Sequence, residues 1–313
     1  MTEIPTKGKI DVIKKGIIDG NPHLDLLIAD YFDSFFNGFL SYKIDYMTLP
    51  QNSTFTNIVV QGIDEISLLK KDFIDFLKVI INSHNYCKPE LFIDFFERLL
   101  QFYSDNNINL YTGDNLNSYA FDNYRFFNQD LFISFVSTLI DYKRFDVLSG
   151  VISARLIVTT SGYSGQAESV NYIRFREYNY TLNEFVNKTY PNRHYSVTAD
   201  FMKKYSQESY FENLVRTDIL LYYLSIIYPG DNFLDRLWYP ELSFYNHQPQ
   251  ILPKLISKRY FESCKCLFGV DTVDEFKKLL LKLTDSIQQM NNDVHSVPAI
   301  KTGLLYDTVA TVD

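Results

Sequence analysis

The chain has 313 residues, 46% of them apolar, and a net charge of −8. This apolar content excludes global disorder, and the negative charge disfavours nucleic acid as a partner unless a local basic face exists. The three cysteines and an N-terminus without an apolar signal segment predict a reducing, cytoplasmic location. No membrane association is expected, because the longest apolar run, residues 219–228, is far shorter than the ~20 residues of a membrane span.

The first part of the chain has apolar residues at steps of three and four, which is typical of amphipathic helices. Asn, Asp and Ser then dominate residues 104–128, a composition that favours a boundary between two lobes. We therefore predict a helical lobe over residues 1–112 and a second over residues 113–313. The helices predicted in the first lobe cover residues 8–19, 23–42, 63–82 and a stretch from Pro89 to about 102.

The second lobe is also expected to be helical, with a loop at residues 159–170 and another around residues 189–195. Pro240 interrupts any helix over residues 236–246, so a short extended segment is predicted there. The helices predicted before it cover residues 129–141, 144–157, 171–188, 196–205 and 209–228.

Two further helices are expected near the end of the chain. Pro253 opens the first, and Gly269 is typical of a position just beyond a helix end. Thr272 and Glu275 form a capping box, in which each side chain satisfies a free backbone N–H group at the start of the last long helix. The fold class predicted is mainly α: a multi-helix bundle in two lobes with a few short extended segments.

No phosphate-binding glycine loop and no recognised metal-ligand spacing is present in the sequence, so no cofactor and no metal site are predicted. Weak catalytic candidates are Asp94 with Glu97, a carboxylate pair on one helix, and Arg193 with His194 in a polar loop. Solvated helix faces and an exposed loop are the favoured interpretation of these four residues.

An aromatic tract around Pro240 has a different character. Trp238, Tyr239, Phe244 and Tyr245 could form a stacking or peptide-binding surface. They could equally form a plug packed between helices, and burial of Trp238 is the favoured prediction.

The most basic stretch of the chain is residues 251–284, with seven positive and four negative side chains. Lys254, Lys258 and Arg259 are its candidate binding residues. Solvated helix faces are the simpler interpretation, and a nucleic-acid-binding surface is an alternative.

Three strings carry a resemblance to a known class of proteins: VRTDILLYYLSIIY at 215–228, LWYPELSFY at 237–245 and ISKRYFESCKCLFGVDTVDEFKKLL at 256–280. In this order they resemble the helical region that accompanies effector domains, such as Toll/interleukin-1 receptor domains, in bacterial immune-type proteins. The resemblance implies a role in bacterial antiviral defence. It carries over no active-site residue, because the effector domain itself has no counterpart here.

Together these features predict a non-catalytic helical interaction or sensing module of a defence-like system. It would act by protein–protein association, with a protein partner or as a homo-oligomer. The alternatives are an enzyme with a dispersed active site, such as a nuclease or hydrolase, and a nucleic-acid-binding protein that uses residues 251–284.

Overall fold

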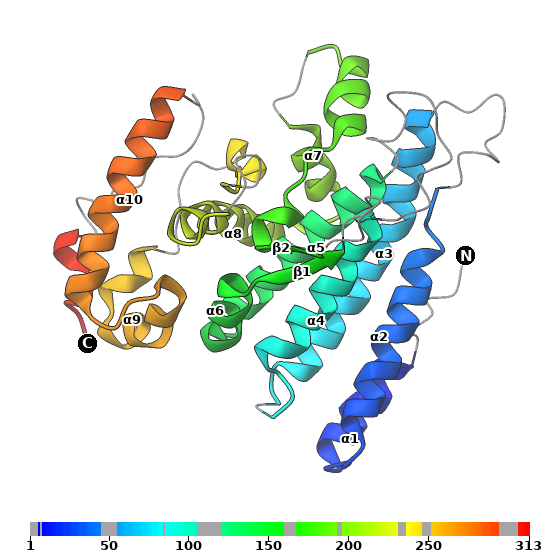
Figure 1. Ribbon diagram of the computed structural model, residues 1–313, viewed down its shortest axis with the longest axis horizontal. Coiled ribbons are helices and arrows are strands. Elements are labelled where there is room, and N and C mark those ends of the chain that lie inside the picture. Colours follow the sequence, from blue (N-terminus) through cyan, green and yellow to red (C-terminus); the bar gives the residue numbers. More distant parts are fainter. Residues whose placement is uncertain are drawn as a thin grey trace.

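The fold is mainly helical, as predicted (Figure 1). The computed structural model describes the chain over residues 6, 8–44, 55–83, 85–104, 121–159, 167–192, 196–230, 236–245, 252–293 and 306–313. In this part of the chain, none of the helices combines the length and the apolar character that crossing a membrane requires.

The helices and strands of the described residues are as follows. The α-helices are α1 (Lys9–Ile18), α2 (Leu24–Leu40), α3 (Phe55–Ile80), α4 (Pro89–Leu100), α5 (Asp122–Asp141), α6 (Phe145–Ser153), α7 (Val197–Lys204), α8 (Glu208–Ile227), α9 (Lys258–Cys264) and α10 (Val273–Asp293). The strands are β1 (Leu156–Thr159) and β2 (Ala167–Val170). The short helical turns are η2 (Gln101–Ser104), η4 (Tyr172–Phe175), η5 (Thr181–Val186), η6 (Asn187–Thr189), η7 (Glu241–Phe244), η8 (Leu252–Ile256) and η9 (Lys265–Phe268).

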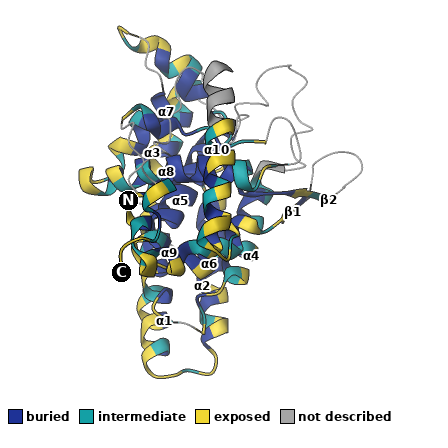
Figure 2. Ribbon diagram, turned by 90° about the vertical axis from the view of Figure 1, so that its left-hand side faces the viewer, coloured by how far each residue is buried: buried dark blue, intermediate teal, exposed yellow. Residues whose placement is uncertain are grey.

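Helix α5 lies at the centre of the molecule and is buried along almost its whole length (Figure 2). Aromatic rings fill the space around it. Phe73 of α3 stacks on Phe95 of α4 with ring centroids 4.5 Å apart, and Phe132 of α5 stacks on Phe175 of η4 at 4.6 Å. Such pairs add to the stabilisation from apolar burial, so the high Phe content serves the core.

A continuous cluster of buried side chains runs from Ile13 to Val309, and α3 packs along α5. The predicted lobe boundary near residue 112 lies outside the described residues. Helices α1 to α4 lie toward one end of the long axis, and α9, α10 and the C-terminus lie at the other (Figure 1).

An ion pair joins α3 to α5 inside the core. Nζ of Lys70 lies 2.6 Å from Oδ2 of Asp130, and both side chains are buried. Ser134 and Ser137, one and two turns further along α5, are buried as well, and their hydroxyls find no partner among the described residues. The central helix therefore carries a polar stripe that only tertiary packing could bury.

Several predicted boundaries are wrong. Helix α5 begins at Asp122, inside the stretch whose composition favours a lobe boundary, because its polar side chains are buried by α3 and the turn η4 rather than exposed. The predicted loop 159–170 contains part of an antiparallel hairpin in which Leu156 pairs with Val170 and Thr159 with Ala167. Residues 171–188 are not one helix but separate short turns, η4 to η6.

The end of the chain also differs in detail from expectation. The helix predicted from Pro253 is divided into η8, α9 and η9, since Ser257 caps a new helix by accepting a hydrogen bond from the N–H of Tyr260 at 3.3 Å. The segment expected to be extended at 236–246 is irregular up to Pro240 and then forms η7. Gly269 with φ of 63° ends η9, as predicted. The capping box is confirmed: Thr272 accepts from the N–H of Glu275, and the Glu275 carboxylate accepts from the N–H of Thr272, both at 3.2 Å.

Candidate functional site

The carboxylate candidates Asp94 and Glu97 both lie on α4, three residues apart. Oε1 of Glu97 accepts a 2.8 Å hydrogen bond from the N–H of Ile157, so this side chain fastens β1 to α4. Asp94 is exposed and borders a separate hollow of about 380 Å³ that Asp25, Lys88 and Glu90 also line. Among the described residues, no group of three or more metal-binding side chains is placed to hold an ion.

Arg193 and His194, the other two catalytic candidates, lie outside the described residues.

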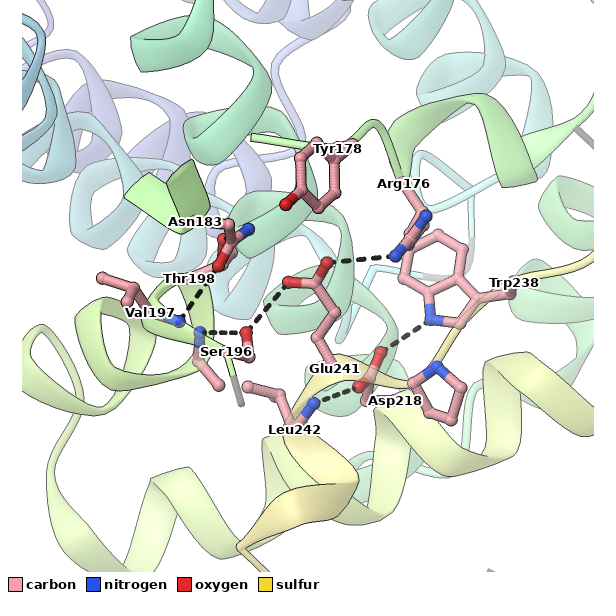
Figure 3. Close-up of polar contacts among 12 residues, drawn as sticks. Arg176, Tyr178, Asn183, Ser196, Val197, Thr198, Asp218, Trp238, Glu241 and Leu242 are labelled. Carbon is pink, nitrogen blue, oxygen red and sulfur yellow. Dashed lines mark hydrogen bonds and ion pairs between the residues drawn. The ribbon is translucent and has the colours of Figure 1, made fainter. Parts of the chain in front are cut away.

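Trp238 is completely buried, as predicted, and a network of hydrogen bonds holds it against α8 (Figure 3). Its indole N–H donates to Oδ1 of Asp218 at 2.6 Å, and its backbone N–H donates to the Ser225 hydroxyl at 3.0 Å. The second oxygen of Asp218 accepts from the N–H of Leu242 at 2.8 Å. Burial raises the pKa of Asp218 to about 7, and the donated hydrogen bonds oppose this rise. Trp238 therefore belongs to the packed core and is not part of an exposed binding surface.

Glu241 extends the same network to α7 (Figure 3). This carboxylate is buried and lies 3.1 Å from the guanidinium of Arg176. Its other oxygen accepts from the hydroxyl of Ser196 at 3.3 Å. Ser196 in turn caps α7 by accepting from the N–H of Ala199 at 3.1 Å. The network therefore ties the aromatic tract to two helices.

The other aromatic candidates are less buried than Trp238. The guanidinium of Arg176 lies 5.0 Å from the ring centre of Tyr239. Tyr245 is 40% exposed, packs edge-on against Phe211 at 5.1 Å and donates from its hydroxyl to Asp200. Phe244 is half-buried. The four aromatic side chains therefore do not form one exposed surface.

Two of the basic candidates, Lys254 and Arg259, lie together in a cleft of about 660 Å³. Lys143, in the turn between α5 and α6, brings a third positive charge to the same cleft. The remaining lining is apolar or carries hydroxyl groups: Pro253, Ile256, Ser257, Tyr260, Ser263 and Val312. Among the described residues that line it, none carries a carboxylate. We call this site the cationic cleft.

The charges of the cationic cleft are available to a ligand. Within the described part of the chain, neither Lys143 nor Arg259 forms an ion pair, and Nζ of Lys254 rests 5.9 Å from the ring centre of Tyr260. Burial raises the pKa of Tyr260 to about 12, so its hydroxyl stays neutral and adds no negative charge at pH 7. The three cations create a local positive field on an otherwise acidic protein, and the carboxyl of Asp141, outside the lining, reduces this field through its electrostatic interaction with Lys254.

Lys143 occupies an unusual backbone position. Its φ is 56°, in the left-handed region, which glycine adopts without strain and other residues adopt at a cost. The N–H of Lys143 donates to the carbonyl of Ile140 at 3.0 Å, and that of Arg144 to the carbonyl of Leu139 at 2.8 Å. This is the Schellman pattern that closes a helix, and glycine is the usual residue at the position of Lys143. Lysine at this position makes the turn less stable than glycine would, and it places a positive charge in the cleft.

The third basic candidate, Lys258, lies beside the cleft and holds the end of the chain. Residues 309–313, which we call the strap, run along the cleft edge with Val309 buried. The N–H of Val312 donates to Ile256 at 3.1 Å, and the N–H of Lys258 donates back to Val312 at 2.8 Å. Nζ of Lys258 lies 2.9 Å from the carboxylate of Asp313.

Sequence reasoning missed Lys143, Tyr260 and Ser263. The available signal was a helix end, Asp141-Tyr142-Lys143-Arg144, with basic residues where a glycine would be expected. No family model, no curated protein and no solved structure matches this chain.

Proposed function

We propose that this protein is a non-catalytic helical binding module whose cationic cleft takes an anionic group of a protein partner. The observation that carries the proposal is the convergence of Lys143, Lys254 and Arg259 in one cleft without a lining carboxylate. The cleft has the volume of ordinary ligand sites. A cluster of positively charged side chains favours a negatively charged partner and speeds its association.

The sequence resemblance of residues 215–280 supports a role beside an effector in a bacterial defence system. Its three strings lie in α8, in the tract around Trp238 and in the segment that contains α9, and α9 forms a wall of the cationic cleft. We expect the protein to act in the cytoplasm, with its partner or with further copies of itself.

Retention on a heparin column at pH 7 and low salt tests the binding of anions at the cleft. Because the whole chain carries a charge of −8, retention requires a local cationic site. We expect the wild-type protein to be retained and a Lys143→Gly/Lys254→Gln/Arg259→Gln variant to flow through. Lys278→Gln, on the exposed face of α10, is the control that should elute like wild type. Equal retention of the triple variant would refute the proposal.

A further inference from the structure

The strap is a peptide segment of the chain itself that is bound at the edge of the cationic cleft, so its contacts indicate which kind of peptide this surface can bind. It is a peptide in which a small aliphatic side chain, Val309, is buried and a carboxylate, Asp313, meets a lysine. Its backbone pairs in parallel with residues 255–258, and the N–H of Ala310 donates to the carbonyl of Leu255 at 2.9 Å. The chain thus binds one acidic, aliphatic peptide segment immediately beside the cleft.

The cleft continues this surface with the same chemistry. Val312 of the strap forms part of its wall, next to Ile256 and Pro253, and the three cations face the same space. Among the described lining residues, Tyr260 is the only aromatic ring on which a base could stack, whereas proteins that bind single strands stack successive bases on several rings. The lining offers positive charge and apolar contact, which suits alternating carboxylate and aliphatic side chains.

We infer that the cationic cleft binds an extended acidic segment of a partner protein, with acidic and small aliphatic residues in alternation. Successive side chains of an extended peptide point to opposite sides, so carboxylates can meet Lys143, Lys254 and Arg259 while aliphatic side chains pack on the wall that contains Val312. This inference rests on the proposed function, because it specifies the anion that the cleft takes.

The test uses the full chain and a fluorescein-labelled peptide, Asp-Val-Asp-Val-Asp, measured by fluorescence polarisation. We expect saturable binding that weakens about tenfold or more in Lys254→Gln/Arg259→Gln, corresponding to the loss of roughly 1.4 kcal/mol. The neutral peptide Asn-Val-Asn-Val-Asn should compete at least about tenfold less well, since it keeps the shape and loses the charge. Both substitutions are on exposed side chains, and Lys278→Gln serves as the matched control.

Inorganic phosphate and a ten-nucleotide oligothymidine are tested in parallel as competitors. Peptide binding that is tighter than either, and dependent on Lys254 and Arg259, supports the inference. Oligothymidine or phosphate binding with equal or higher affinity at the same residues overturns it, while the proposed anion-binding function stands. If no probe binds, or if binding is unchanged in the double variant, both the inference and the proposed function fail.

Discussion

The indole N–H of Trp238 donates a 2.6 Å hydrogen bond to Oδ1 of Asp218, and both side chains are completely buried. Asp218 comes from the middle of α8 and Trp238 from an irregular segment that follows it. This hydrogen bond therefore anchors residues 236–240, which belong to no helix or strand, to α8. Its energetics can be measured separately from those of the cationic cleft.

The first prediction concerns the pH dependence of stability. Burial raises the pKa of Asp218 to about 7, above its ordinary value of 3.8, so the folded state holds the proton more strongly than the unfolded state. The stabilisation from Asp218 is complete below pH 3.8 and is lost as the pH rises toward 7. We compare urea unfolding of wild type and Asp218→Asn at both pH values. From pH 5 to pH 7 the unfolding free energy of wild type should fall by about 2 kcal/mol relative to that of Asp218→Asn. Parallel pH profiles would contradict this assignment.

The second prediction concerns Trp238 itself. Because the ring is buried against Phe132 and Tyr172, with centroids 6.0 Å away in each case, Trp238→Ala should cost about 3–5 kcal/mol of unfolding free energy. Urea denaturation followed by circular dichroism measures this. Tyr245→Ala, at a 40% exposed position, is the control and should cost less. Strong iodide quenching of the wild-type tryptophan would refute the burial.

The third prediction concerns the ion pair of Lys70 and Asp130. Replacing Lys70 by Met leaves a buried carboxyl without its cation and should destabilise the fold by roughly 3–5 kcal/mol. Lys70→Met/Asp130→Leu removes both charges and should recover most of that loss. Urea midpoints of the single and double variants decide the matter. A neutral effect of Lys70→Met would show that this carboxyl does not need its partner.

The sequence predicts most of the helices because their apolar residues repeat with the helical period. The buried faces of α2 and α4 follow this rule, with Phe35 and Phe39 on one and Phe92 and Phe95 on the other. The helical period fails at the start of α5, since the polar residues Asp122 and Asn123 are buried there and lie in a stretch whose composition favours a boundary between lobes. Each strand of the hairpin has only four residues, too few to establish an alternating pattern.

The candidate site is only partly visible in the sequence for a related reason. Lys254 and Arg259 belong to one basic stretch, so composition suffices to find them. Lys143 lies more than a hundred residues earlier and reaches the cleft only because α6 packs against α9. Its contribution depends on tertiary contacts that no local pattern encodes.

The fourth prediction separates stability from binding at Lys143. Lys143→Gly relieves the left-handed backbone and should stabilise the fold by about 1 kcal/mol, while it removes a charge from the cleft and weakens retention on heparin. Lys143→Ala removes the same charge without relieving the backbone, so it should weaken retention with no gain in stability. Thermal unfolding and heparin elution of the two variants give both quantities. A loss of stability in Lys143→Gly would contradict the account of this turn.

The most direct test of the central claim locates the bound anion on the protein. Lysine acetylation is quantified at each residue by mass spectrometry, with and without a heparin-derived oligosaccharide. We predict that the oligosaccharide protects Lys143 and Lys254, which line the cationic cleft, and leaves Lys278 of α10 as reactive as before. Protection confined to the lysines of α10, or no protection at Lys143 and Lys254, would contradict the assignment of the cleft as the binding site.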